Sequence, residues 1–384
     1  MSDYRGTLER ELERLSPPRI PFDQLARRRD RKRRDQRIRA GVLGLAIVLV
    51  MGWLGLSAIR SAPPVPADDP TPTRLGIFAD VRGWITYGDV ASYEAKGIWA
   101  VDPANPDEHP VLLSRGAGLP VAWSSDGSKL LINRGAPYFG GQHSLVVLNS
   151  DGSETQVAHA DTITGGSFTP EGSKVVYGVT VGGKDWKSGI YTVDAKGGTP
   201  QLLYAAARRR IAREAYPTDV FRFAVYFPTL SPDGSRIAYI EGMGDWGNSL
   251  WVMNADGTDR HRIIAWEEGN DLVWADSLQW SPDGTRLAFE GSGHEGAGIY
   301  VVNSDGSALT VVARGSDLRD PRAPYWSPDG SRIAFQRSTP EGGFQSDGTL
   351  YTMAPDGDDV QSLGRNALPF GVLLGPWNPL VPQA

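Results

Sequence analysis

A four-residue phrase, Ser-Pro-Asp-Gly, returns along this chain within a longer pattern that has an aromatic residue before it and apolar residues after it. The clearest copies begin at Trp280 and Trp326, a third begins at Leu230, and weaker ones begin at Trp123 and Phe168. Self-similarity at a period of about 20 to 50 residues is typical of architectures in which each repeat packs on its neighbours. The pattern therefore constrains the fold of the chain before any single element is assigned.

Each copy predicts a β-hairpin. Proline presets the backbone at the first central position of a turn, aspartate tolerates the next, and glycine supplies the left-handed residue that closes it. Short β-branched and aromatic runs such as Arg332 to Phe335 follow, as expected of strands. A second hairpin comes after each first one, and its six copies start at Gly97, Leu145, Gly189, Leu250, Gly298 and Leu350. The first hairpin has only five copies.

The missing sixth copy is at the end of the chain. In the segment from Gly375 to Pro379, Trp377 and Pro379 match Trp326 and Pro328 of the last complete copy. The first strands, predicted at Trp84 to Tyr87, Gly97 to Val101 and Pro110 to Leu113, lack such a partner. Pairing the two ends would close a ring and remove open sheet edges. We therefore predict an all-β, six-bladed β-propeller over residues 75–384, with Trp123, Trp280, Trp326 and Trp377 in its inter-blade core.

These repeats resemble the Ser-Pro-Asp-Gly repeats of TolB-like propellers, which are related in style to WD repeats. The resemblance covers residues 75 to 380 and is strongest in the copies at Leu230, Trp280 and Trp326, while the Phe168 copy reads Thr-Pro-Glu-Gly. It implies a six-bladed β-propeller. It implies little about activity, because this fold serves scaffolds, peptide binders, lyases and domains of serine peptidases.

The residues before the repeats predict a membrane anchor. Gly41 to Ile59 carries no charge, and at about 1.5 Å per residue a helix of this length covers roughly the 30 Å core of a bilayer. An arginine-rich run from Arg27 to Arg39 precedes it. The positive-inside rule therefore predicts a cytoplasmic head at residues 1–40, a single transmembrane helix at 41–60 and an extracytoplasmic remainder. A cleaved signal peptide is the alternative, although its apolar region would usually be shorter.

Two further segments belong to this arrangement. Residues 61–74 are rich in proline, which holds an extended path and predicts a semi-rigid stalk. Within the head, Leu8, Leu12 and Leu15 fall at helical spacing and predict a short amphipathic helix. That helix either lies on a surface without a partner or docks a cytosolic regulator. The basic run lies beside the span, so we expect anionic lipid headgroups as its partner and no nucleic acid.

No catalytic motif is evident. The chain has no cysteine, no Gly-x-Ser-x-Gly nucleophile elbow and no metal-binding spacing among its five histidines. The Asn-x-Asp-Gly turns lack the alternating acids of a calcium loop. We therefore predict no cofactor and no metal site. The sequence favours a non-catalytic binding protein, with a lyase-type envelope enzyme using the propeller channel and a structural envelope scaffold as alternatives.

Fold geometry indicates where a ligand would bind. If four strands run outward in each blade, both glycine-containing hairpins lie at one end, and the second-to-third and fourth-to-first loops lie at the other. Large rigid side chains on those loops would suit a protein, peptide or glycan ligand. The alternative interpretation is that these side chains only pack against neighbouring loops. The candidate ligand-binding residues are Tyr93, Tyr138, Phe139, Trp186, Trp246, His294 and Phe344.

One interval between repeats is longer than the others. The surplus lies between Ala205 and Tyr226 and includes Arg208, Arg209, Arg210, Arg213 and Arg222. As a fourth-to-first connection it would reach the same end of the propeller as the candidate residues. It is predicted either as a basic, partly helical flap that admits an anionic ligand or as an ordinary solvated insertion.

Overall fold

The computed structural model describes most of the repeat region. The chain separates into two units, Met1–Pro64 and Val65–Ala384, and every described residue belongs to the second. The described residues are 76–89, 97–106, 108–135, 143–181, 188–206, 208–210, 220–222, 224–242, 248–265, 272–293, 296–315, 320–338, 346–365 and 372–380. No helix among them is long and apolar enough to cross a membrane. The predicted head, transmembrane helix and stalk lie outside them.

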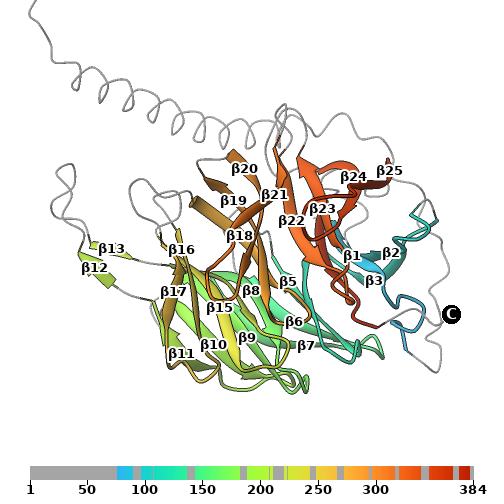
Figure 1. Ribbon diagram of the computed structural model, residues 1–384. Coiled ribbons are helices and arrows are strands. Elements are labelled where there is room, and N and C mark those ends of the chain that lie inside the picture. The colour runs from blue at the N-terminus through green and yellow to red at the C-terminus, as the bar shows by residue number, and fades with distance from the viewer. Residues whose placement is uncertain are drawn as a thin grey trace, which may run out of the picture. The chain divides into compact units, whose positions relative to one another are not determined.

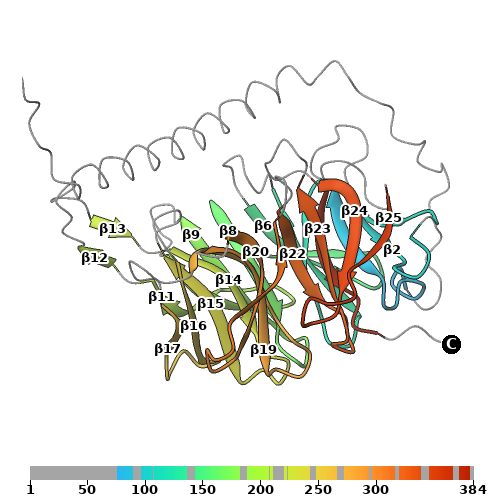
Figure 2. The same cartoon turned by 45° about the horizontal axis from the view of Figure 1, so that its top comes forward.

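Six four-stranded antiparallel sheets form the blades of a propeller (Figures 1 and 2). Blade 1 consists of β26 (Val372–Trp377), β1 (Ile85–Asp89), β2 (Gly97–Val101) and β3 (Val111–Arg115). Blade 2 consists of β4 (Leu119–Trp123), β5 (Lys129–Arg134), β6 (His143–Asn149) and β7 (Glu154–Ala160). Blade 3 consists of β8 (Thr162–Phe168), β9 (Lys174–Val181), β10 (Gly189–Asp194) and β11 (Gln201–Ala205).

The second half of the ring repeats this plan. Blade 4 consists of β14 (Ala224–Leu230), β15 (Arg236–Gly242), β16 (Asn248–Asn254) and β17 (His261–Ile264). Blade 5 consists of β18 (Leu272–Trp280), β19 (Arg286–Gly293), β20 (Gly296–Asn303) and β21 (Thr310–Arg314). Blade 6 consists of β22 (Pro321–Trp326), β23 (Ile333–Ser338), β24 (Ser346–Met353) and β25 (Gln361–Arg365). The predicted all-β, six-bladed architecture is confirmed.

The ring closes through strands from both ends of the repeat region. β1 pairs with β2 on one side and with the last strand, β26, on the other, and Ile85 lies opposite Trp377. The first strands of the six blades contact one another in the order β4, β8, β14, β18, β22, β26 and back to β4. They are therefore the innermost strands, and the predicted mixed blade is correct.

The repeated turn is held by its own polar side chains. In blade 5, Ser281 Oγ donates to Asp283 Oδ1 at 2.6 Å, and the Thr285 amide donates to the same oxygen at 3.0 Å. Gly284 has a φ of 68°, a left-handed conformation that glycine adopts without a steric cost. Ser-Pro-Asp-Gly thus serves as turn chemistry, in agreement with its interpretation from the sequence.

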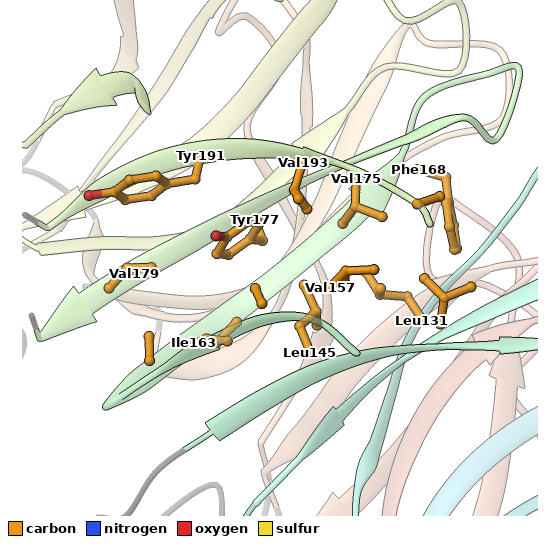
Figure 3. Packing of buried hydrophobic residues seen from close by; sticks show 14 residues of the cluster. Leu131, Leu145, Val157, Ile163, Phe168, Val175, Tyr177, Val179, Tyr191 and Val193 are labelled. Carbon is orange, nitrogen blue, oxygen red and sulfur yellow. The ribbon is translucent and has the colours of Figure 1, made fainter. Parts of the chain in front are cut away.

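Apolar residues fill the spaces between blades. In the cluster between blades 2 and 3, Leu131 and Leu145 pack with Phe168 and Tyr177 (Figure 3). Trp123, Trp280 and Trp326 are buried as predicted, and Trp377 packs against the apolar cluster between blades 6 and 1. Between blades 4 and 5, Trp280 Nε1 donates to the carbonyl of Thr229 at 3.0 Å. These contacts join each blade to the next without covalent links.

The long insertion contains a small antiparallel sheet of its own. β12 (Arg208–Arg210) pairs with β13 (Val220–Arg222), and Arg209 lies opposite Phe221. These six residues pair as strands, and the rest of the predicted flap between them, residues 211–219, lies outside the described residues. Arg213 lies outside the described residues.

Candidate functional site

Each innermost strand is interrupted by a bulge. In blade 5, Asp276 lies opposite Glu290, but the next pair along the ladder is Gln279 opposite Ala288, so β18 has one residue more than its partner. The equivalent position, three residues before the last aromatic or apolar residue of the strand, recurs in all six blades. It is occupied by Pro120, Gly165, Phe227, Ser277, Ala323 and Leu374. All six of these residues line one cavity in the central channel.

Three of the bulges place a residue other than glycine in the left-handed region. Phe227 has a φ of 50°, Ser277 of 53° and Ala323 of 50°, while Gly165 in blade 3 has 84°. A side chain in this region carries a steric cost, and such residues gather at sites where the backbone must be aimed. Blades 4 to 6 therefore each have a strained residue at the channel bulge, and each has a second one, Asp259, Ala308 or Asp359, in the turn between its third and fourth strands.

The cavity has a volume of about 190 Å³. Its walls come from the bulges of the innermost strands and the residues on either side of them, from Asn133, Glu290 and Gln336 of the second strands, and from His143 at the start of β6. The cavity therefore lies part-way along the channel, at the level of the bulges.

Second-strand residues at one repeat position reach across to the next blade. Asn133 Nδ2 donates to the Ile163 carbonyl at 3.0 Å, Glu290 Oε2 accepts from the Ala323 amide at 3.3 Å, and Gln336 Oε1 accepts from the Leu374 amide at 3.0 Å. All three side chains are buried. They satisfy backbone groups beside the bulges that the irregular ladder leaves without a strand partner.

Two other blades have glycine at this position, for a steric reason. A Cβ on Gly178 would approach Pro228 Cδ of the next blade at 2.9 Å, and a Cβ on Gly88 would collide with the Gly118 carbonyl. Blade 4 has Ile240, which is fully buried. Polar side chains therefore reach the channel from only three of the six blades at this level.

A charged cluster lies where blades 5 and 6 meet. Asp276 and Glu290 are cross-strand neighbours, and Arg322 Nε lies 3.6 Å from Glu290 Oε1. Burial raises the pKa of Asp276, whose Oδ1 accepts from the Ser277 amide at 2.6 Å. Burial, followed by the charge of Asp276, raises the pKa of Glu290. Two carboxyls side by side with one guanidinium cannot both ionise at low cost, because like charges oppose each other in a medium of low dielectric constant.

His143 lies in blade 2, three blades away around the ring. Its side chain is only 3% exposed, and burial lowers its pKa. Nδ1 is 3.3 Å from Asn133 Oδ1. Because Asn133 uses its NH₂ group on Ile163, its oxygen must accept, so His143 Nδ1 carries the proton. Nε2 is then an unprotonated acceptor on a residue that lines the cavity.

None of the seven candidate residues predicted from the sequence can be placed. Tyr93, Tyr138, Phe139, Trp186, Trp246, His294 and Phe344 all lie outside the described residues. The structure instead draws attention to Asp276, Glu290, Arg322 and His143, which sequence reasoning missed. One signal was available: Glu290, Asn133 and Gln336 each come ten residues after the last aromatic residue of the preceding strand. In the part of the chain that the structure describes, no three His, Asp or Glu side chains gather as a metal site.

Solved structures share this architecture. A TolB protein of Agrobacterium tumefaciens is 22% identical, with a TM-score of 0.52 over 74% of this chain and 88% of its own. TolB of Acinetobacter baumannii is 15% identical, with a TM-score of 0.56 over 78% of this chain and 68% of its own. The described residues have the TolB-like propeller fold.

A third solved structure is similar to a comparable degree. The nidogen/laminin complex contains a chain that is 10% identical, with a TM-score of 0.53 over 76% of this chain and 97% of its own. No family model and no curated protein matches the sequence. At these identities the likeness of the TolB-like propeller to its neighbours concerns the fold alone, so function must be argued from the site.

Proposed function

We propose that this protein is a single-pass membrane protein whose extracytoplasmic TolB-like propeller binds a protein, peptide or glycan without catalysis. The observation that carries the proposal is the channel cavity at the level of the bulges, whose wall includes charged side chains. The second-to-third loops contain Tyr93, Trp186 and Trp246. A ligand held by aromatic residues on the loops could extend one group into the cavity.

The size of the cavity favours contact with part of a ligand over enclosure of a whole one. Pockets that enclose a small molecule are usually about 300 to 1,000 Å³, whereas this cavity is about 190 Å³. It would admit one side chain or a similar small group. Most of the contact area would then come from the loops around it.

The membrane anchor and the role of the head are part of the same proposal. The uncharged run from Gly41 to Ile59 and the arginines before it support a cytoplasmic head and an outer propeller. The head would then dock a cytosolic regulator. Protease treatment of intact cells tests the orientation: cleavage within residues 75–384 is expected, and full protection of that region would refute it.

The binding function is tested by crosslinking and pull-down from membranes, with the full chain and a head-only fragment of residues 1–40 as separate baits. We expect a partner that the full chain captures and the head does not. Crosslinkers are placed both on the loops and in the channel of the propeller. If the full chain then captures no protein that the head fragment does not also capture, the result would contradict a ligand-binding propeller.

A second candidate function is an envelope enzyme that works in the channel. The observation in its favour is the buried pair Asp276 and Glu290, because carboxyls with raised pKa values are suited to proton transfer. Turnover of envelope glycans by the purified protein, with and without added divalent metal, separates the two candidates. Turnover that is lost in Glu290→Gln would replace the binding proposal with this one.

A further inference from the structure

Charge balance around the cavity is incomplete. Among the described residues, the charged and titratable groups that face it are Asp276, Glu290, Arg322, Tyr325 and the neutral His143, and the charge of Asp320 nearby also raises the pKa of Glu290. Arg322 supplies one positive charge and so balances one carboxylate. The second carboxyl must keep a proton or find another cation, since an uncompensated buried charge is costly.

The opposite wall provides an independent acceptor. His143 is almost fully buried, and its protonated Nδ1 is directed to Asn133. No described residue donates a hydrogen bond to its Nε2. Blade 2 and blade 5 face each other across a six-bladed ring, so this acceptor and the carboxyl pair lie on opposing sides of the cavity.

We propose that the cavity binds one primary ammonium group at the carboxyl pair Asp276–Glu290, with Nε2 of His143 as a further acceptor in the opposite wall. The inference rests on the proposed binding function and names the chemistry of the group that enters the channel. An ammonium has three donors and no acceptor, which suits a cavity whose wall presents carboxylate oxygens and an imidazole acceptor. The group belongs either to a lysine side chain of a partner or to a free alkylamine.

Binding exchanges one cation for another. The ammonium enters with its positive charge, the carboxyl O–H bond of the pair breaks, and the proton leaves to solvent. The two carboxylates are then balanced by Arg322 and the ligand. Since the ligand replaces a proton, its affinity rises with pH by up to about tenfold per pH unit while the pair holds that proton.

The test is calorimetric titration of the full chain in lipid nanodiscs. The probes are n-butylammonium and its neutral match n-butanol, and two peptides that differ only by lysine against norleucine. We expect butylammonium to bind at least about tenfold more tightly than butanol, with about one proton released. Buffers of different ionisation enthalpy measure that release. If the lysine peptide binds and free butylammonium does not, the ammonium group belongs to a protein partner.

Variants locate the site. Asp276→Asn and Glu290→Gln are each expected to weaken butylammonium binding by about tenfold or more and to abolish proton release. Asp305→Asn, in the turn between β20 and β21 at the other end of blade 5, is the matched control and should bind as the wild type does. If a variant fails to fold, the pH dependence of wild-type affinity still decides, and an affinity independent of pH contradicts the exchange.

Three results would overturn the inference: equal affinity for butylammonium and butanol, unchanged affinity in both folded variants, or preferential binding of Ca²⁺. The proposed partner-binding function can fail independently of the ammonium site. Butylammonium binding without any captured membrane partner supports the cavity and removes the partner-binding function. A captured partner that is indifferent to Asp276→Asn and Glu290→Gln keeps that function and removes the ammonium site.

Discussion

The guanidinium of Arg286 lies 4.8 Å from the centre of the Trp326 ring, across the boundary between blades 5 and 6. The preceding boundary repeats the contact, with Arg236 lying 4.9 Å from the centre of the Trp280 ring. In these two copies the arginine and the tryptophan that it contacts belong to different blades: the residue after the turn reaches the tryptophan of the next copy. This pairing makes the repeat an inter-blade contact as well as a hairpin.

Removing that contact should loosen one boundary. Arg286→Ala is expected to lower the free energy of unfolding by about 1 kcal/mol, the usual size of a partly exposed cation–π contact with its packing. Lys174→Ala is the matched control, because Lys174 has the same repeat position but is followed by Leu230 at the next boundary. Urea unfolding measures both. Equal losses in the two variants would contradict a specific contribution from the tryptophan.

The turn aspartates should make stability depend on acid. Hydrogen bonds, first from Ser281 and then from the Thr285 amide, lower the pKa of Asp283 to about 2. A carboxyl whose pKa is lowered by folding stabilises the folded state at pH values above the pKa of an unfolded aspartate, near 3.9. That contribution is lost as the pH falls towards about 2. Asp283→Asn should therefore be less stable than the wild type at pH 7. The difference in urea midpoint should shrink at acidic pH, and a constant difference would refute this origin.

Ring closure should depend on Gln336. This buried side chain accepts from the Leu374 amide of blade 1, so Gln336→Leu leaves a buried donor without its acceptor. We expect a loss of about 1–3 kcal/mol in unfolding free energy. Ile240→Leu changes the equivalent position in blade 4 with no hydrogen bond at stake and should cost less than about 1.5 kcal/mol. Urea titration compares them, and similar small losses would show that the bond to blade 1 contributes little.

The carboxyl pair should oppose stability at higher pH. A raised carboxyl pKa means that the folded state holds its proton longer than the unfolded chain does. The stabilising contribution of the bound proton is fully present at pH values below the pKa of an unfolded glutamate, near 4.3. It is lost as the pH rises through the pKa of Glu290 in the folded protein. Glu290→Gln removes this loss, so its stability relative to the wild type should increase from pH 4 to pH 9. Thermal unfolding measured along that series tests the sign, and a decrease would contradict it.

The loop aromatics predicted from the sequence make a separate prediction. Trp186→Ala with Trp246→Ala should weaken capture of a partner by the full chain, because large aromatic residues often contribute about 2 kcal/mol or more at binding sites. Trp99→Ala, in β2 of blade 1 and so outside blades 3 and 4, is a control for general loss of packing. Quantitative pull-down provides the measurement. Undiminished capture by the double variant would exclude that surface.

The repeat itself was sufficient to predict the architecture. Proline, aspartate and glycine have strong local backbone preferences, so each Ser-Pro-Asp-Gly turn could be located without knowledge of the rest. The match between Trp377 and Trp326 then identified the closing strand, which pairs with β1. The strand pair in the insertion was not predicted, because β12 and β13 are joined by register between segments ten residues apart and not by a local pattern.

The cavity was decided by tertiary structure. Asp276 and Arg322 occupy bulge-adjacent positions in different blades, and a bulge arises from how two strands pair, which local residue preferences do not encode. His143 and Glu290 are far apart in sequence and share a cavity only because the ring closes. The sequence by itself determined the number of blades and the way they close, because turns are local; the chemistry of the channel came from closure, because only a closed ring brings six strands around one axis.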